Sequence, residues 1–310
     1  MSHFFTYAVL TSTFGAALAL AASFLFAALG ETVGQRSGVV NLGVDGIMLL
    51  SAFTTYYAAL KTGDLAIGIL AGIGVGLVMG VITALVSVTL KAEQGISGIG
   101  VYLFGLGFSD LLFLRLVGTP LPINQLKPLA IPLLSRIPGI GPIFFQQTIL
   151  VYLAFLLVPV VTLLLNRTTY GLKVRAAGEN PAAADSVGIS IAKIRWSTVL
   201  FGCTMAGLAG AALLLYDGIF MENLTQSEGF IAVALVYFGA WRPAGVMGGS
   251  LLYGLTIAVV LEWKSLGIIP LSASDLAATA PAVITILALL IVARRFRQPA
   301  VLGRPFERGG

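Results

Sequence analysis

The sequence has almost none of the residues that build catalytic and metal centres. Its 310 residues include one cysteine, Cys203, and one histidine, His3. A lone cysteine excludes an internal disulfide, and a lone histidine leaves too few groups for a Cys/His metal cluster or a Ser-His-Asp triad. The composition therefore predicts a protein that is not an enzyme.

Charge is also scarce. Charged side chains make up 10% of the chain, as 18 Lys plus Arg and 13 Asp plus Glu, whereas hydrophobic residues make up 58%. Soluble domains carry roughly 25% charge, so a soluble globular protein is excluded. The net charge of +5 does not indicate nucleic acid, because ten of the 18 cations fall in just two stretches, 166–195 and 294–308. Such clustering reports membrane orientation instead.

Long apolar runs are what the sequence has in abundance. A helix needs about 20 mostly apolar residues to cross about 30 Å of hydrocarbon. The sequence therefore predicts an all-α polytopic membrane protein, one domain over 1–310, with about nine membrane segments and a range of about 8–10. The first run lacks a basic leading segment, which favours a retained helix over a cleaved signal peptide. Clear runs lie at 5–29, 65–90, 146–165, 196–216, 243–261 and 276–293, and weaker ones at 38–60, 96–117 and 229–241.

The charges of the connecting segments predict their sides of the membrane. The connection 166–195 and the tail 294–310 each carry five cations, so we expect both, and hence the C-terminus, in the cytoplasm. The loop 217–228 carries three acidic residues and no cation, which predicts an external position. Counting spans backwards places the N-terminus outside, although Lys127 and Arg136 then lie externally against the charge bias.

Glycines recur in register within the run 65–90. Gly68, Gly72, Gly76 and Gly80 are four residues apart and so share one helix face. Small residues let a neighbouring backbone approach closely in a membrane. The spacing predicts an interior helix with a packing function.

Polar residues enter the membrane in the weaker run 38–60. Asn41, Gly43, Asp45 and Gly46 lie about a turn inside its boundary. A carboxylate there is costly unless it is hydrated or paired, and unwound backbone at that depth must line a cavity or be buried in protein. The pattern predicts a broken or re-entrant helix near 38–60, with Asn41 and Asp45 in a substrate pathway. A purely structural alternative, in which Asp45 caps a helix and Asn41 bonds a carbonyl, is compatible with it.

Aromatic side chains supply further candidates for the pathway. Phe104 and Phe108 could line a pore or stack on a flat solute, and their alternative is an interfacial belt or core position. Asp110 and Arg115, five residues apart, are too far round a helix to form an ideal pair, so we interpret them as interfacial or loosely paired with other groups. The same alternatives hold for Tyr216, Phe220, Tyr237, Phe238 and Trp241.

The connection 166–195 contains signals for a short helix near 180–188. Asn180 suits the N-cap, Pro181 the first helical position, and Gly188 a left-handed stop, while Asp185 lies in the early turns. Such a helix could be gripped by a soluble partner, or it could simply rest at the lipid headgroups. The sequence has no G-x-x-x-x-G-K-[ST] motif, so energy would have to come from another subunit.

Four motifs of the chain, taken together, resemble those of a known family. The permease subunits of bacterial ABC importers for nucleosides and simple sugars carry similar motifs in the same order, and they are related to branched-chain amino-acid and ribose permeases. The similarity spans about 25–295, and one departure is Asp45 where the family usually has Glu. The motifs are GETVGQRSGVVNLGVDGIMLLSAF, GENPAAADSVGI, FGCTMAGLAGAALLL and GFIAVALVYFGAWRPAGVMGGSLLYG.

The resemblance implies an alternating-access pore subunit in the bacterial plasma membrane. It implies that 41–46 lies near the translocation path and that the cargo is a small neutral polar solute, with nucleosides favoured over ribose-like sugars or branched-chain amino acids. Implied partners are an ATPase subunit that uses ATP and Mg, a second permease that is a homologue or a copy, and an extracytoplasmic binding protein; this chain itself binds no cofactor. The implied coupling residues are Glu179, Asn180, Pro181, Asp185 and Gly188.

A secondary transporter driven by an ion gradient is the rival from another class. Such proteins need a coupling-ion site and usually have intramembrane carboxylates or inverted repeats. Asp45 and Asp110 are the acidic candidates, and the sequence has no clear internal repeat.

Overall fold

The computed structural model describes residues 6–292 and 298–307, and this part of the chain is almost entirely helical. Two-residue strands β1 (Leu129–Ala130) and β2 (Gln146–Gln147) pair antiparallel. The helices are α1 (Tyr7–Arg36), α2 (Val44–Thr62), α3 (Leu65–Ala84), the π-helical η1 (Leu85–Thr89), α4 (Gln94–Leu116), the 3-10 η2 (Leu134–Arg136), α5 (Ile140–Phe144), α6 (Ile149–Arg167), α7 (Thr169–Glu179), α8 (Pro181–Ser186), α9 (Ile191–Asp217), α10 (Glu228–Phe238), α11 (Pro243–Ser265), the 3-10 η3 (Leu271–Ala273), α12 (Ser274–Ala278) and α13 (Ala280–Val292).

Six of the described helices are long and apolar enough to cross a membrane. They are α1, α3 with its extension η1, α4, α6, α9 and α11. The other three predicted segments correspond to α2, which is less apolar, and to α10 and α13, which have 11 and 13 residues. The all-helical membrane architecture is confirmed, whereas the predicted count of about nine membrane segments is not.

Short polar caps explain where two of the long helices begin. The Asp64 carboxylate accepts the amide of Ala66 at 2.8 Å and so starts α3. The Glu93 carboxylate accepts the amides of Ile96 and Gly95 and starts α4, and these two hydrogen bonds lower the pKa of that carboxyl group.

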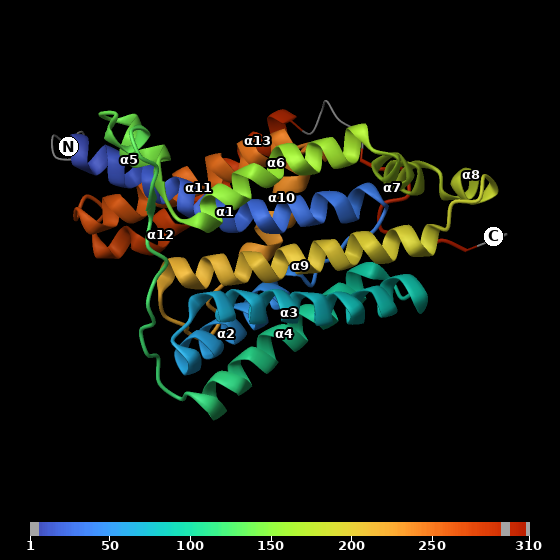
Figure 1. Ribbon diagram of the computed structural model, residues 1–310, viewed down its shortest axis with the longest axis horizontal. Coiled ribbons are helices and arrows are strands. Elements are labelled where there is room, and N and C mark those ends of the chain that lie inside the picture. The colour runs from blue at the N-terminus through green and yellow to red at the C-terminus, as the bar shows by residue number, and fades with distance from the viewer. Residues whose placement is uncertain (1–5, 293–297, 308–310) are drawn as a thin grey trace.

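Helices α1 and α9 form the centre of the molecule. They run side by side through the middle of Figure 1, α1 in blue and α9 in yellow, and most of their residues are buried. Ser23 Oγ donates to the carbonyl of Ala209 at 3.1 Å, and Ser37 Oγ lies 2.8 Å from Thr198 Oγ1. Since residue numbers rise along α1 as they fall along α9, the two helices are antiparallel.

The remaining helices are arranged around this pair in an inverted pattern. An unwound segment follows α1, and α2 and α3 then pack on α9. A second unwound segment follows α9, and α10 and α11 then pack on α1. Each half therefore supplies a central helix, a break, a shorter helix and a long helix that covers the other half's centre. Inverted halves of this kind are common in membrane transporters. The sequence analysis found no such repeat.

The glycine face of α3 packs closely against its neighbours. The prediction that α3 is an interior helix is wrong. A Cβ on Gly68 would lie 2.8 Å from the carbonyl of Thr55 in α2, and one on Gly76 would lie 2.5 Å from the carbonyl of Cys203 in α9. Gly72 and Gly80 continue this face against α2 and α9. The opposite face is exposed. The prediction failed because glycine spacing indicates one closely packed face and carries no information about the other side of the helix. Exposed on it are Ile67, Leu70, Leu77, Val78, Val81 and Ile82.

The connecting segments gather at two ends of the bundle. Helices α7 and α8 and residues 298–307 lie together at one end, hereafter the α8 end, where the amide of Val301 donates to the carbonyl of Gly178 at 3.1 Å. The start of α1, α5 and α12 lie at the other end of Figure 1, hereafter the α5 end. Of the predicted tail 294–310, only residues 298–307 belong to the described part of the chain.

Candidate functional site

The first break is the unwound segment 37–43 between α1 and α2, and it follows a regular helix stop. Helix α1 continues through Glu31 to Arg36, beyond the end of the predicted apolar run 5–29. Gly38 has a φ of +90°, its amide donates to the carbonyl of Gln35, and the amide of Val39 donates to Gly34. This pair of hydrogen bonds is a Schellman motif, which ends α1 at the left-handed glycine.

The segment 37–43 then runs back into the membrane domain instead of leaving it. Ser37 meets Thr198 near the start of α9, and Asn41 Nδ2 donates to Cys203 Sγ at 3.4 Å. Cys203 is the 13th of the 27 residues of α9. The break therefore reaches the level of the middle of α9, and α2 starts from there; within the predicted run 38–60, residues 38–43 are unwound and the rest belongs to one continuous helix.

Buried polar side chains satisfy the backbone of this break. The amide of Val40 donates to Gln94 Oε1 at 2.8 Å, and that of Asn41 donates to Glu31 Oε2 at 3.4 Å. The amide of Gly43 donates to Asn41 Oδ1 at 2.9 Å. Unwound backbone in a bilayer needs such partners because water is absent. Asn41 therefore supports the break itself, and it is only 4% exposed.

The second break is the irregular segment 218–227 between α9 and α10. Gly218, with a φ of +72°, ends α9, and Asn223, Gln226 and Ser227 also have positive φ angles. This loop carries the acidic residues that predicted an external position, yet it turns back into the bundle. Phe220 is fully buried between aromatic rings of α2 and α4, so it belongs to the core and not to a pore wall.

The two breaks meet at Asp45. Asp45 lies in the first turn of α2, and its Oδ1 accepts the amide of Gly229, in the first turn of α10, at 2.8 Å. The Asp45 side chain is fully buried. Helix N-termini carry partial positive charge and favour an anion, so two helix starts here stabilise one carboxylate. The arrangement ties α2 and α10 together across the middle of the membrane domain.

At the α8 end of the bundle, residues at the start of the first break are hydrogen-bonded to several other elements. The indole of Trp241, after α10, donates to Gln35 Oε1 at 2.8 Å, and Arg36 Nε donates to the carbonyl of Trp241 at 3.0 Å. Arg195 Nε donates to the carbonyl of Ser37 at 3.3 Å. The first break is thus tied to the turn between α10 and α11 near the α8 end, and to the start of α10 at Asp45.

The predicted coupling residues lie at the surface of the α8 end. Asn180 Oδ1 accepts the amide of Ala183 at 3.0 Å as the N-cap of α8, Pro181 is its first residue, and Gly188 follows it with a φ of +86°. The structure adds a second helix, α7, directly before α8. The end of α7 contacts the first break, because a Cβ on Gly178 would collide with the carbonyl of Arg36.

Phe104 and Phe108 are not brought together with Asn41 and Asp45. They stack on each other in α4 with ring centroids 5.3 Å apart, and they are 50% and 39% exposed. The face of α4 that covers the first break carries Val101 instead, which contacts Gly43.

The sequence analysis missed Glu31, Gln35, Gln94 and Arg195 as parts of the site. Glu31 and Gln35 lie between the predicted apolar runs 5–29 and 38–60, and polar residues in such a position usually lie at a surface. An acid four residues before Gln35 in a long helical run was the available signal. No three His, Cys, Asp or Glu side chains in the described residues are placed to hold a metal ion.

Comparison with known proteins gives consistent matches. The family described as branched-chain amino acid transport system permease component matches residues 13–293. TsgC13 of Haloferax volcanii, whose name assigns it to a glucose ABC transporter, is 36% identical over 85% of this chain and 80% of its own. The guanosine ABC transporter permease NupQ of Bacillus subtilis is 31% identical over 95% of this chain and 96% of its own.

A third relative is similar over most of its length. The nucleoside ABC transporter permease NupC of Lactococcus lactis is 33% identical over 86% of this chain and 87% of its own. No solved structure matches the chain.

Proposed function

Because the chain belongs to the family of branched-chain amino-acid transport system permease components, we propose that it forms part of the pore of an ATP-driven importer, with the two breaks around Asp45 as its moving gate. The observation that carries this proposal is the hydrogen bond from Gly229 to Asp45, which joins the starts of α2 and α10 inside the helix bundle. Broken helices in such positions are where membrane transporters bind and release solutes.

Contacts at the α8 end support a route for mechanical coupling. In the proposal, an ATPase subunit grips α8 through Glu179, Asn180, Pro181 and Asp185. A displacement of α7 and α8 then reaches the first break, because the end of α7 at Gly178 contacts the last turn of α1. From there it passes along 37–43 to Asp45 and α10, and alternating access results.

Nucleosides are the proposed cargo. Two of the relatives are named for guanosine or nucleosides. The second candidate is a simple sugar, which the name of TsgC13 supports. Either solute is small, neutral and polar.

The proposal includes partners that family membership implies. An ATPase subunit would bind at the α8 end in the cytoplasm, where the C-terminus would also lie. An extracytoplasmic binding protein would deliver the solute to the α5 end, and a second permease, a copy or a homologue, would complete the pore in the plasma membrane. This chain would then be a non-catalytic subunit, with ATP and Mg used by its partner.

The inverted halves and the buried carboxylates resemble features of ion-driven carriers, so the rival class needs a direct test. We would purify the tagged chain from its own membranes in mild detergent, identify the accompanying proteins, and measure nucleoside uptake by the reconstituted assembly. We expect an ATPase to co-purify and uptake to require ATP. Recovery of the chain alone, with uptake driven by an ion gradient, would refute the proposal.

A matched pair of variants makes the test specific to α8. Glu179→Ala combined with Asn180→Ala should reduce ATPase co-purification at normal abundance in the membrane. Asp275→Ala, an exposed acidic site in α12 at the α5 end, is the control and should leave co-purification unchanged.

A further inference from the structure

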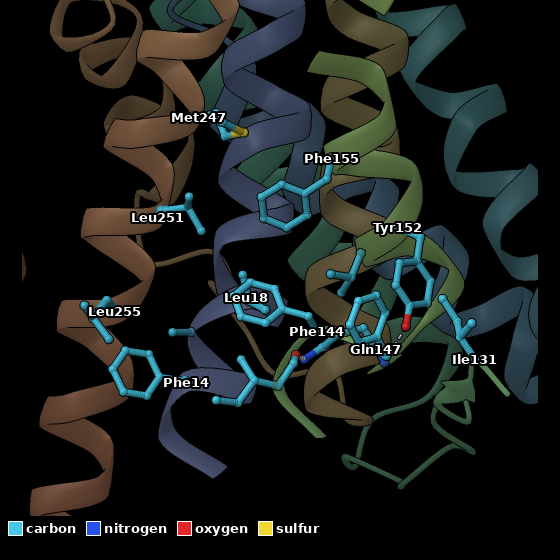
Figure 2. A pocket seen from close by; sticks show the side chains of 14 residues that line it. Phe14, Leu18, Ile131, Phe144, Gln147, Tyr152, Phe155, Met247, Leu251 and Leu255 are labelled. Carbon is cyan, nitrogen blue, oxygen red and sulfur yellow. Dashed lines mark hydrogen bonds between the residues drawn. The ribbon is translucent and has the colours of Figure 1, made fainter. Parts of the chain in front are cut away.

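An apolar recess lies between α1, α6 and α11, away from the two breaks. Its volume is about 690 Å³. Figure 2 shows Leu251 and Leu255 of α11 on one side, Phe155 of α6 on the other, and Leu18 of α1 between them. Ile131 and residues 143–145 cover it at the α5 end.

The recess is elongated along the helices. Its lining on α11 extends from Met247 to Leu255, and that on α6 from Val151 to Phe155, with Gln147 of β2 before it. Eight residues of helix rise about 12 Å, so the long axis of the recess follows the direction in which lipid chains lie in a bilayer.

The few polar atoms in the lining are occupied by the protein. Gln147 Nε2 donates to the carbonyls of Gly15 at 3.2 Å and Ile143 at 2.7 Å. The Tyr152 hydroxyl accepts the amide of Gln147 at 3.2 Å and donates to the carbonyl of Leu129 at 3.4 Å. A nucleoside or sugar would find few hydrogen-bond partners here, so the recess does not suit the transported solute.

We propose that the recess binds one acyl chain of a phospholipid from the leaflet at the α5 end. The three helices that form it are among those able to span the membrane, and Phe14 and Phe144 at its rim are 43% and 50% exposed. Empty apolar cavities take up apolar ligands, and lipid is the abundant apolar molecule at this depth. The proposal is independent of the transported solute.

A helix of a second permease fits the recess less well than a lipid chain. An α-helix with its side chains is about 10–12 Å across and needs an open face. This recess is bounded by helices on three sides and covered at one end by 143–145, which suits a flexible chain. The occupant would contact the cover directly, so lipid binding would order residues 131–145.

Native mass spectrometry of the full chain, purified with its associated subunits in mild detergent, tests the proposal. We expect one phospholipid to remain bound to the wild type and Leu251→Trp, which fills the recess, to reduce its retention at least about fivefold. Leu163→Trp, on an exposed position of α6 outside the recess, is the matched control and should retain the lipid. Equal retention in all three proteins would overturn the proposal.

A second measurement covers the case in which Leu251→Trp fails to fold. Phe155→Trp replaces one aromatic ring by another in the recess, and its fluorescence can be recorded in vesicles with brominated phospholipid chains. We expect the added tryptophan to be quenched as strongly as that of Leu163→Trp. Strong quenching of the control without quenching at position 155 would mean that protein or nothing fills the recess, and the proposal would be wrong.

Discussion

At the scale of single residues, several buried polar groups around the first break are hydrogen-bonded to other parts of the chain. Asp45 receives an amide from α10, Asn41 bonds Cys203, and Glu31 accepts the amide of Asn41. Each bond joins segments that are distant in sequence or separated by a break. These residues therefore hold irregular backbone in place, and changing them should affect the gate more than local helix formation.

Asp45→Ala should reduce uptake at least about tenfold. A hydrogen bond to a charged group contributes about 1.5–3 kcal/mol, and the variant leaves the amide of Gly229 unsatisfied in the bilayer. Asp45→Asn keeps an acceptor oxygen and should lie between the wild type and the alanine variant. ATP-driven uptake, normalised to abundance in the membrane, measures both; full activity of Asp45→Ala would make this residue a bystander.

At the scale of elements, close helix packing depends on which glycines face a neighbour. In α3, Gly76 lies against α9, where a Cβ would meet the carbonyl of Cys203, whereas a Cβ on Gly74 would meet open space. The two glycines are two residues apart in one helix, so they separate packing from intrinsic helix preference.

Gly76→Ala should destabilise the protein by about 1–3 kcal/mol, since an extra methyl group in a packed interface forces the helices apart. Gly74→Ala should be neutral or stabilise it by up to about 1 kcal/mol, because alanine favours the helix. Thermal unfolding in detergent measures both. The packing argument would be contradicted by equal midpoints for the two variants.

The stop after α8 is a second feature of this scale. Gly188 has a φ of +86°, and its amide donates to the carbonyl of Asp185 at 2.9 Å. Gly188→Pro cannot keep either property, since proline fixes φ near −65° and has no amide hydrogen. We expect lower ATP-driven uptake and weaker ATPase association, with normal membrane insertion.

Gly267→Pro is the matched control for this experiment. Gly267 has a φ of +66° and its amide donates to Lys264, but it follows α11 at the α5 end. Its replacement should cause similar local strain without loss of ATPase association. If both variants lost the ATPase equally, general misfolding would explain the effect and α8 would not be the coupling element.

At the scale of the whole molecule, residues 298–307 add hydrogen bonds between elements that also contact one another directly. The amide of Gly303 donates to the carbonyl of Gly38 in the first break, Val301 bonds Gly178 in α7, and Arg195 Nη1 donates to the carbonyl of Arg304 at 2.9 Å. Deleting this segment would therefore loosen α7 from the first break.

Removal of residues 298–310 should raise amide exchange in α7 and α8 about tenfold or more. Three hydrogen bonds of about 0.5–1.5 kcal/mol each are lost, and about 1.4 kcal/mol is a factor of ten. Hydrogen-exchange mass spectrometry follows this directly, and uptake should fall with it. Removal of 308–310 alone is the control, and unchanged exchange in the longer deletion would show that the segment holds nothing in place.

The sequence by itself determined the class of the protein and much of its local structure. Low charge and long apolar runs require a helical membrane protein, and local signals such as Asn180, Pro181 and Gly188 act within a few residues. The break near 38–60 was also predictable, because Asn41, Gly43 and Asp45 are unfavourable in a continuous membrane helix. Such features depend on composition and on neighbours in the chain.

Only the tertiary structure decided which residues meet. That Asp45 bonds Gly229, that Glu31 and Gln35 are buried in a helix, and that 217–228 turns back into the bundle depend on contacts between distant segments. The inverted halves could not be predicted from the sequence for the same reason. Two helices can occupy equivalent positions in a fold without having similar sequences. Hydropathy reports whether a residue can be buried, and only packing decides which partner buries it.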